Sequence, residues 1–163
     1  LVLTATAGAG YLYGEGLKDY LRQMEYLRYI AGMIRGQLEY TGAPLQELLM
    51  DVSAKIKEPY KSWLEHTARR TAKRTADFTE IWKGCVEKDL GAAGLKKEHR
   101  EWIRDFGAFL GQGDRETMGR SIELSMKQMD LMIRQQRGEL AGKRKIGNWL
   151  GVMSGLFLII LLW

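Results

Sequence analysis

The segment "LKDYLRQMEYLRYIAGMIRGQL", residues 17–38, has the clearest periodicity in this chain of 163 residues. Its apolar residues recur at alternating intervals of three and four, at Leu17, Tyr20, Met24, Leu27, Ala31, Ile34 and Leu38. This spacing places them in one stripe along a helix. A coiled-coil partner would use such a stripe, but packing inside the chain's own bundle explains it better. Both interpretations predict a long helix with one buried face.

The segments that follow also have helical spacing, and none of them alternates in the manner of a strand. Gly42 is placed to end the first helix, and Pro44 suits the first turn of the second. Further helices are expected to begin near Pro59 and Asp77 and to span about residues 96–110 and 114–145. The sequence therefore predicts an all-α fold, a helical bundle of about six helices.

The C-terminal segment "IGNWLGVMSGLFLIILLW", residues 146–163, contains no charged residue. As a helix it would be roughly 27 Å long, just enough to cross the hydrocarbon core of a membrane. Three basic residues, 143–145, lie immediately before it, as is typical of the flank of a membrane span. A buried core helix is the alternative interpretation. We expect a C-terminal transmembrane helix.

The N-terminal segment "LVLTATAGAGYLYG", residues 1–14, is shorter. Its apolar face continues into the following helix, which favours the end of a truncated transmembrane helix over a signal-peptide remnant or a structured end. Lys18 and Arg22 follow it, so that basic residues flank both expected spans. The positive-inside rule then predicts that residues 15–145 form a cytoplasmic domain anchored at both ends.

Glycines recur at intervals of four in both terminal segments. They are Gly10 and Gly14 at one end, and Gly147, Gly151 and Gly155 at the other. Small residues at this spacing let helix backbones approach closely within a membrane. The alternative is that glycine is simply common in membrane helices. The spacing favours helix pairing, either between the two spans or with another membrane protein.

The segment "TARRTAKRTADF", residues 67–78, repeats threonine and alanine every four residues. Beside the alanines lies a basic strip formed by Arg69, Arg70, Lys73 and Arg74. A solvated helix face explains the strip best, and contact with acidic lipid or an acidic protein is the next interpretation. Nucleic-acid binding is disfavoured, because no aromatic residues are interleaved and Glu65 and Asp77 flank the strip.

The segment "FGAFLGQGDRETMGRSIEL", residues 106–124, has the glycines of a phosphate-binding loop. However, Glu116 occupies the third glycine position of G-x-G-x-x-G, and no strand precedes the segment. A joint between two helices fits better: Gly111 ends the first helix, Gly113 gives the turn its freedom, and Asp114 caps the second. We name these three residues the signature loop. A structural joint and a partner contact both remain open.

The residues needed for catalysis are not found in a recognisable pattern. His66 and His99 lie in separate predicted helices without metal-ligand spacing, and no phosphate-loop motif occurs. The single cysteine, Cys85, excludes an internal disulfide and fits a reducing compartment. We therefore expect a non-enzymatic protein without a cofactor, a metal or a small-molecule substrate.

Three motifs resemble the stage III sporulation protein AB family of endospore-forming bacteria. They are "FGAFLGQGDRE" at 106–116, "LGVMSGLFLIILL" at 150–162 and, more weakly, "QLEYTGAPLQELL" at 37–49. The order and spacing of the motifs match from about Leu17 to the end. The chain departs from the family at Met118–Gly119, where the family typically has a glutamine. The threonine–alanine–arginine repeat has no counterpart in the family pattern.

The resemblance implies a platform subunit similar to the cytoplasmic domains of type II secretion F and type IV pilus platform proteins. Such a subunit would lie in the mother-cell (outer forespore) membrane, with its soluble domain facing the mother-cell cytoplasm. It would belong to the transenvelope complex that links mother cell and forespore. Its expected partners are a secretion-type ATPase and the other stage III sporulation A-operon membrane proteins. A membrane-tethered sensor or adaptor is the alternative function.

Overall fold

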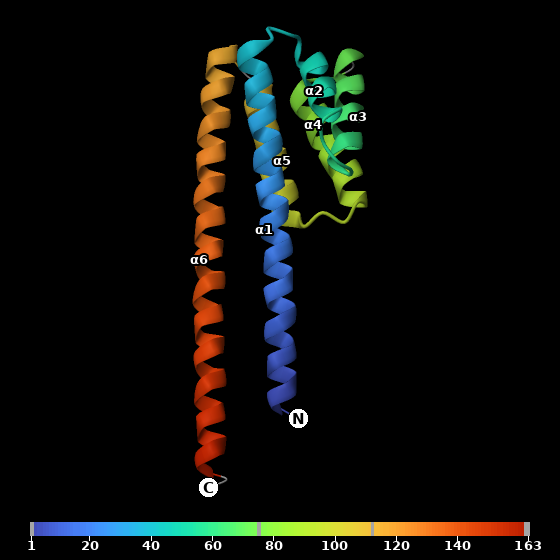
Figure 1. Ribbon diagram of the computed structural model, residues 1–163. Helices are drawn as coiled ribbons and strands as arrows, with labels where there is room; N and C mark the ends of the chain where they lie inside the picture. The colour runs from blue at the N-terminus through green and yellow to red at the C-terminus, as the bar shows by residue number, and fades with distance from the viewer. Residues whose placement is uncertain (1, 75, 112, 162–163) are drawn as a thin grey trace. The chain divides into compact units, whose positions relative to one another are not determined.

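The computed structural model describes the backbone of residues 2–74, 76–111 and 113–161 and, within these, the side chains of 15–139 and 141–142. These ranges contain six α-helices, one π-helical turn and no strand, which confirms the predicted all-α class (Figure 1). The elements are α1 (Val2–Tyr40), α2 (Leu45–Ser53), α3 (Tyr60–Ala72), α4 (Phe78–Cys85), η1 (Val86–Leu90), α5 (Lys97–Leu110) and α6 (Arg115–Leu161).

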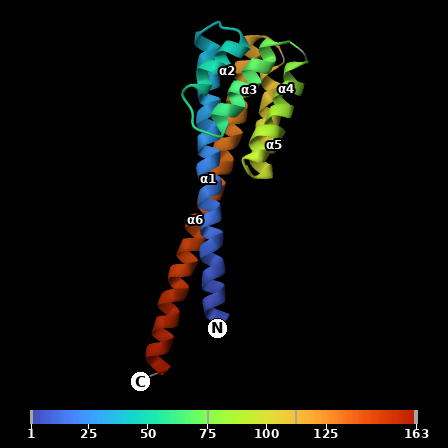
Figure 2. The same cartoon turned by 90° about the vertical axis from the view of Figure 1, so that its right-hand side faces the viewer.

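Two compact units make up the chain. Residues 24–129 form one unit, here called the bundle, and residues 1–23 together with 130–163 form the other. The bundle contains the end of α1, the helices α2 to α5 with η1, and the beginning of α6. Helix α2 packs against α3, α3 against α4, and α4 against α5 (Figure 2).

From Met24 onward the predicted stripe of α1 is buried within the bundle, whereas Leu17 and Tyr20 are partly exposed. Its buried side chains are Met24, Leu27, Ala31, Ile34 and Leu38. The helix ends as predicted, because Gly42 adopts a φ of 59° and so turns the chain out of the helical path. The next helix begins directly after Pro44, which confirms the expected place of that proline.

Only the backbone of the predicted membrane spans is described. The backbone is helical over residues 2–14 and 146–161, but the side chains of 1–14 and 143–163 are not described. Among the described residues, no helix combines the length and the hydropathy needed to cross a membrane.

The centre of the bundle is built around Trp82 of α4. Its ring packs edge-on against Trp63 of α3, with ring centroids 4.7 Å apart, and lies 6.2 Å from Phe106 of α5. The indole Nε1–H donates to the carbonyl oxygen of Ile103 at 2.8 Å, so the buried ring has a satisfied polar atom. Its neighbour Ile81 is buried as well.

A π-helical turn, η1, extends α4 and was not predicted from the sequence. It buries Val86 and Leu90, and it leaves Lys88 exposed and Asp89 partly exposed. The carboxylate of Asp89 lies 3.1 Å from His66 Nδ1, so this part of the turn faces α3. Wider turns of this kind are rare and often occur at functional sites.

Candidate functional site

The helices alternate in direction, so three helix junctions gather at one end of the bundle (Figure 1). At this end Arg115, the first residue of α6, donates from Nη2 to the carbonyl oxygens of Gly42 and Ala43, the latter at 2.8 Å. A Cβ built on Gly111 would lie 2.9 Å from Thr79 Oγ1, so the start of α4 is also adjacent. We call residues 41–44, 77–79, 111 and 113–115 together the loop end.

The signature loop has the structure predicted for a helix joint. Helix α5 ends at Leu110 and α6 begins at Arg115. Gly113 adopts a φ of 87°, which strongly favours glycine, and Asp114 accepts a hydrogen bond from the backbone N–H of Thr117 at 2.8 Å. Gly111 has an ordinary φ of −92°, so its lack of a side chain serves the close approach to α4.

The cap at Asp114 predicts a dependence of stability on pH. Hydrogen bonds from Thr117 lower the pKa of the Asp114 carboxyl below its ordinary value of 3.8. A carboxyl with a depressed folded-state pKa contributes its stabilisation above the unfolded-state pKa, and loses it as the pH falls through the folded-state pKa. We expect Asp114→Ala to lower the melting temperature by a few degrees at pH 7 and by less near pH 3.

Asp114→Asn is the matched control, because its amide oxygen can cap the helix at either pH. Thermal unfolding followed by circular dichroism measures all three proteins. An equal loss for Asp114→Ala at both pH values would show that the ionised carboxylate is not the stabilising group.

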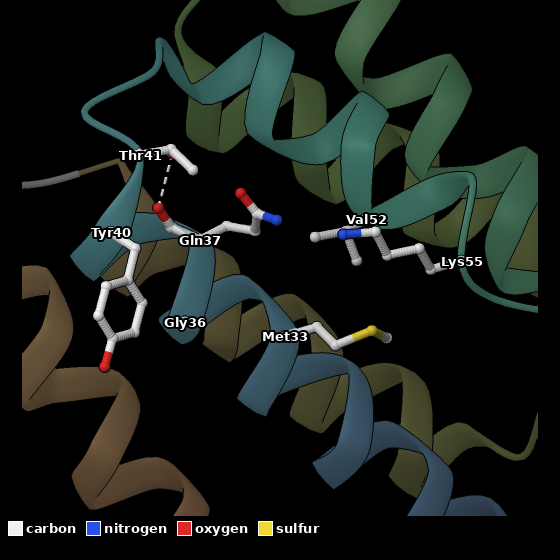
Figure 3. Close-up of a pocket in the computed structure, with 7 residues that line it drawn as sticks. All are labelled: Met33, Gly36, Gln37, Tyr40, Thr41, Val52 and Lys55. Atoms are coloured by element: carbon white, nitrogen blue, oxygen red, sulfur yellow. Dashed lines mark hydrogen bonds between the residues drawn. The ribbon is translucent and has the colours of Figure 1, made fainter.

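Two hollows lie beside the loop end. One, of about 260 Å³, lies between the end of α1 and α2, and the other, of about 530 Å³, is a shallow depression on the signature-loop side. In the first hollow, Met33, Gln37 and Val52 point toward one another (Figure 3). The second is lined by Leu38, Glu39, Gly42, Arg115 and Glu116.

Two side chains at these hollows have unusual surroundings: one is a buried acceptor without a donor in the described part of the chain, and the other is an aromatic ring exposed to solvent. Gln37 Oε1 is buried and accepts no hydrogen bond from the described residues. Tyr40 is 87% exposed, and its ring points away from the cluster around Met33 (Figure 3). A buried acceptor without a donor and an exposed aromatic ring are features of surfaces that bind another protein.

The residues of the basic strip are all exposed, but they do not form one uniform face. Arg69 and Arg70 line a cavity together with side chains of η1, whereas Lys73 caps the end of α3. Arg74 follows with a φ of 51°. The strip is therefore divided between the side of the bundle and the α3–α4 connection.

The contacts of the terminal glycines, which were predicted to let helices pair within a membrane, are not described by the structure. Gly10, Gly14, Gly147, Gly151 and Gly155 lie in the helical parts of α1 and α6 whose side-chain surroundings are outside the described residues. Their role in helix pairing stays a prediction.

Within the described residues, no group of three His, Cys, Asp or Glu side chains is arranged to hold a metal ion. His66 pairs with Asp89, and His99 is buried in α5. The absence of enzymatic activity stays a prediction from the sequence.

The fold defines a class: all-α proteins built as a helical bundle, here with three helix junctions gathered at one end. The family model of stage III sporulation protein AB matches residues 1–163, and the chain belongs to this family. The protein of that name from Bacillus subtilis (strain 168) is 22% identical over 161 residues, 99% of this chain and 94% of the relative. The resemblance seen in the three motifs is confirmed, and the chain is a member of a sporulation family.

A solved structure of stage III sporulation protein AB has the same fold. It superimposes with a TM-score of 0.63 at 19% identity, covering 73% of this chain and 94% of that chain.

Proposed function

We propose that the protein is a non-enzymatic, membrane-anchored platform subunit of the transenvelope complex between mother cell and forespore. In this role it binds a secretion-type ATPase of the same operon and the other stage III sporulation A-operon membrane proteins. Its bundle faces the mother-cell cytoplasm. Membership of the sporulation family supports the biological setting.

Anchoring by both ends is part of the proposal. It rests on the uncharged C-terminal segment, on the basic residues 143–145 before it, and on the apolar N-terminal segment. Deletion of residues 146–163 is expected to shift the protein from the alkali-resistant membrane pellet toward the supernatant. Alkaline extraction of membranes followed by immunoblotting measures the distribution. An unchanged distribution would show that this segment contributes nothing to anchoring.

The loop end is the surface that we propose for the ATPase. One observation carries this assignment: Arg115 joins two of the motifs that mark the family, 37–49 and 106–116, into a single surface. Next to that joint, Tyr40 exposes most of its ring. Exposed aromatic residues and arginine are the residue types that contribute most to protein interfaces.

Tyr40→Ala is the direct test. We expect the change to weaken binding of the operon's ATPase to the full chain by about tenfold or more, because a buried tyrosine at an interface often dominates the affinity. The folded bundle keeps its stability, since the ring is almost fully exposed. Co-purification from cells and titration of the purified ATPase measure the effect, and complementation of spore formation measures its consequence.

Tyr29→Ala is the matched control, since Tyr29 lies on the same helix and is 53% exposed. We expect it to leave ATPase binding within about twofold of the original affinity. Equal losses for the two variants would refute a specific role of the loop end. Failure of the unmodified chain to bind the ATPase at all would refute the proposed partnership.

A further inference from the structure

A third cavity lies on the side of the bundle, between α3 and η1. It has a volume of about 220 Å³ and is lined by His66, Arg69, Arg70, Cys85, Lys88 and Asp89. We call it the basic pocket. Helix α3 supplies three of these residues and the α4–η1 segment supplies the other three. The π-helical turn matters here, because it directs Asp89 toward α3 and leaves Lys88 at the cavity.

Only some of the basic side chains that line the basic pocket form ion pairs with carboxylates. Among the described residues, no carboxylate lies within ion-pair distance of Arg70 or Lys88, while Asp89 pairs with His66 at 3.1 Å. Arg69 has a distant partner in the partly buried Glu65, 3.8 Å away on the same helix. The cavity therefore carries excess positive charge.

Arg70 has unused hydrogen-bonding capacity. Its Nη1 contacts the buried sulfur of Cys85 at 3.9 Å, and a thiol is a weak acceptor. A guanidinium has five N–H donors in a planar fork that matches the two oxygens of a carboxylate. This contact holds the Arg70 guanidinium at the cavity while most of its donors stay available.

From this geometry we infer that the basic pocket binds a carboxylate side chain from an acidic segment of a partner protein. The carboxylate forms charge-assisted hydrogen bonds with Arg70, and Lys88 adds a second cation from the opposite wall of the cavity. The loop end and its ATPase are not needed for this binding.

Other anionic macromolecules fit the pocket less well. The basic strip, residues 69–74, covers roughly 8 Å of chain at helical rise, which is short for a groove that follows a nucleic-acid backbone. The nearby rings of Trp63 and Trp82 are buried and so are not available to stack on nucleic-acid bases.

A membrane surface also fits less well. Helices that lie on membranes pair basic residues with exposed large apolar side chains. None of the exposed large apolar side chains among the described residues lies on α3 or η1.

A labelled glutamate peptide tests the inference. The full chain is purified in uncharged detergent, and binding of the peptide is followed by fluorescence anisotropy at low ionic strength. We expect binding that weakens with added salt, and an affinity loss of about tenfold for Arg70→Gln and for Lys88→Gln. Both residues are exposed, so thermal unfolding should show that the variants fold normally.

Lys61→Gln is the matched control, because it removes the same charge from an exposed position of α3 that does not line the pocket. We expect it to weaken peptide binding by less than about twofold. Equal losses for Lys61→Gln and Arg70→Gln would overturn the inference, since binding would then reflect net charge alone.

Two further probes separate the classes of partner. The same proteins are tested with a uridine oligonucleotide and with vesicles of phosphatidylcholine and phosphatidylserine. Binding of either probe that depends on Arg70 and exceeds peptide binding would overturn the inference in favour of an RNA or a lipid site. Failure of the full chain to bind the glutamate peptide at low ionic strength would also overturn it.

Discussion

Replacing Gly107 with alanine is expected to lower the free energy of unfolding by about 4 kcal/mol, a large fraction of the total stability of a small domain. A Cβ at this position would lie 2.0 Å from Cδ1 and 2.2 Å from Nε1 of Trp82. The indole is fully buried and cannot move without losing its hydrogen bond to Ile103 and its packing against Trp63. Urea unfolding followed by tryptophan fluorescence measures the change.

Gly84→Ala provides the control for helix propensity. Gly84 is exposed on α4, and no atom lies within 4 Å of a Cβ built there. Alanine should therefore stabilise the protein by roughly 0.5–1 kcal/mol, through helix propensity alone. If Gly107→Ala behaved like Gly84→Ala, the close packing of α4 on α5 would be disproved.

The second large effect is expected at Arg115. Arg115→Ala removes two hydrogen bonds from a charged donor to the carbonyl oxygens of Gly42 and Ala43, and so separates the α1–α2 connection from the start of α6. We expect a loss of about 1.5 kcal/mol in the free energy of unfolding. The midpoint of urea unfolding measures this loss. Under the proposed function, ATPase binding should fall with it, because the two halves of the loop end are no longer held together.

Arg120→Ala is the control, since Arg120 lies one turn along α6 and pairs with Glu116 on the exposed surface. Such pairs contribute only about 0.3–0.5 kcal/mol. Arg115→Lys should restore only part of the stability, because the lysine side chain is one bond shorter and its ammonium group reaches less far than the Nη2 atom that donates to both carbonyl oxygens. Similar losses for Arg115→Ala and Arg120→Ala would contradict a bridging role for Arg115.

Local signals were sufficient for most of the helix boundaries. Gly42 and Pro44 marked the α1–α2 connection, and Asp114 marked the start of α6, because each of these residue types acts on its own backbone. The stripe of α1 was also predictable, since residues three and four apart share one face of any helix.

The candidate sites were predicted less completely. The signature loop was found as a helix joint, but the link from Arg115 to residues 42–43 crosses more than seventy positions. One sequence signal for this contact was available. A basic residue in the first turn of a helix interacts unfavourably with the helix dipole, so Arg115 could be expected to bind an acceptor elsewhere in the chain. The basic strip was found on α3, but the cavity needs Lys88 and Asp89 from η1, a turn that no residue type marked in advance.

By itself, then, the sequence determined the all-α class, the order of the helices and the uncharged ends, because periodicity, caps and composition act over a few neighbouring residues. The tertiary structure decided which distant segments meet: Gly107 beneath Trp82, Arg115 against the α1–α2 connection, and η1 beside α3. These contacts depend on how whole helices pack, and packing is set by the shapes of surfaces that lie far apart in the chain.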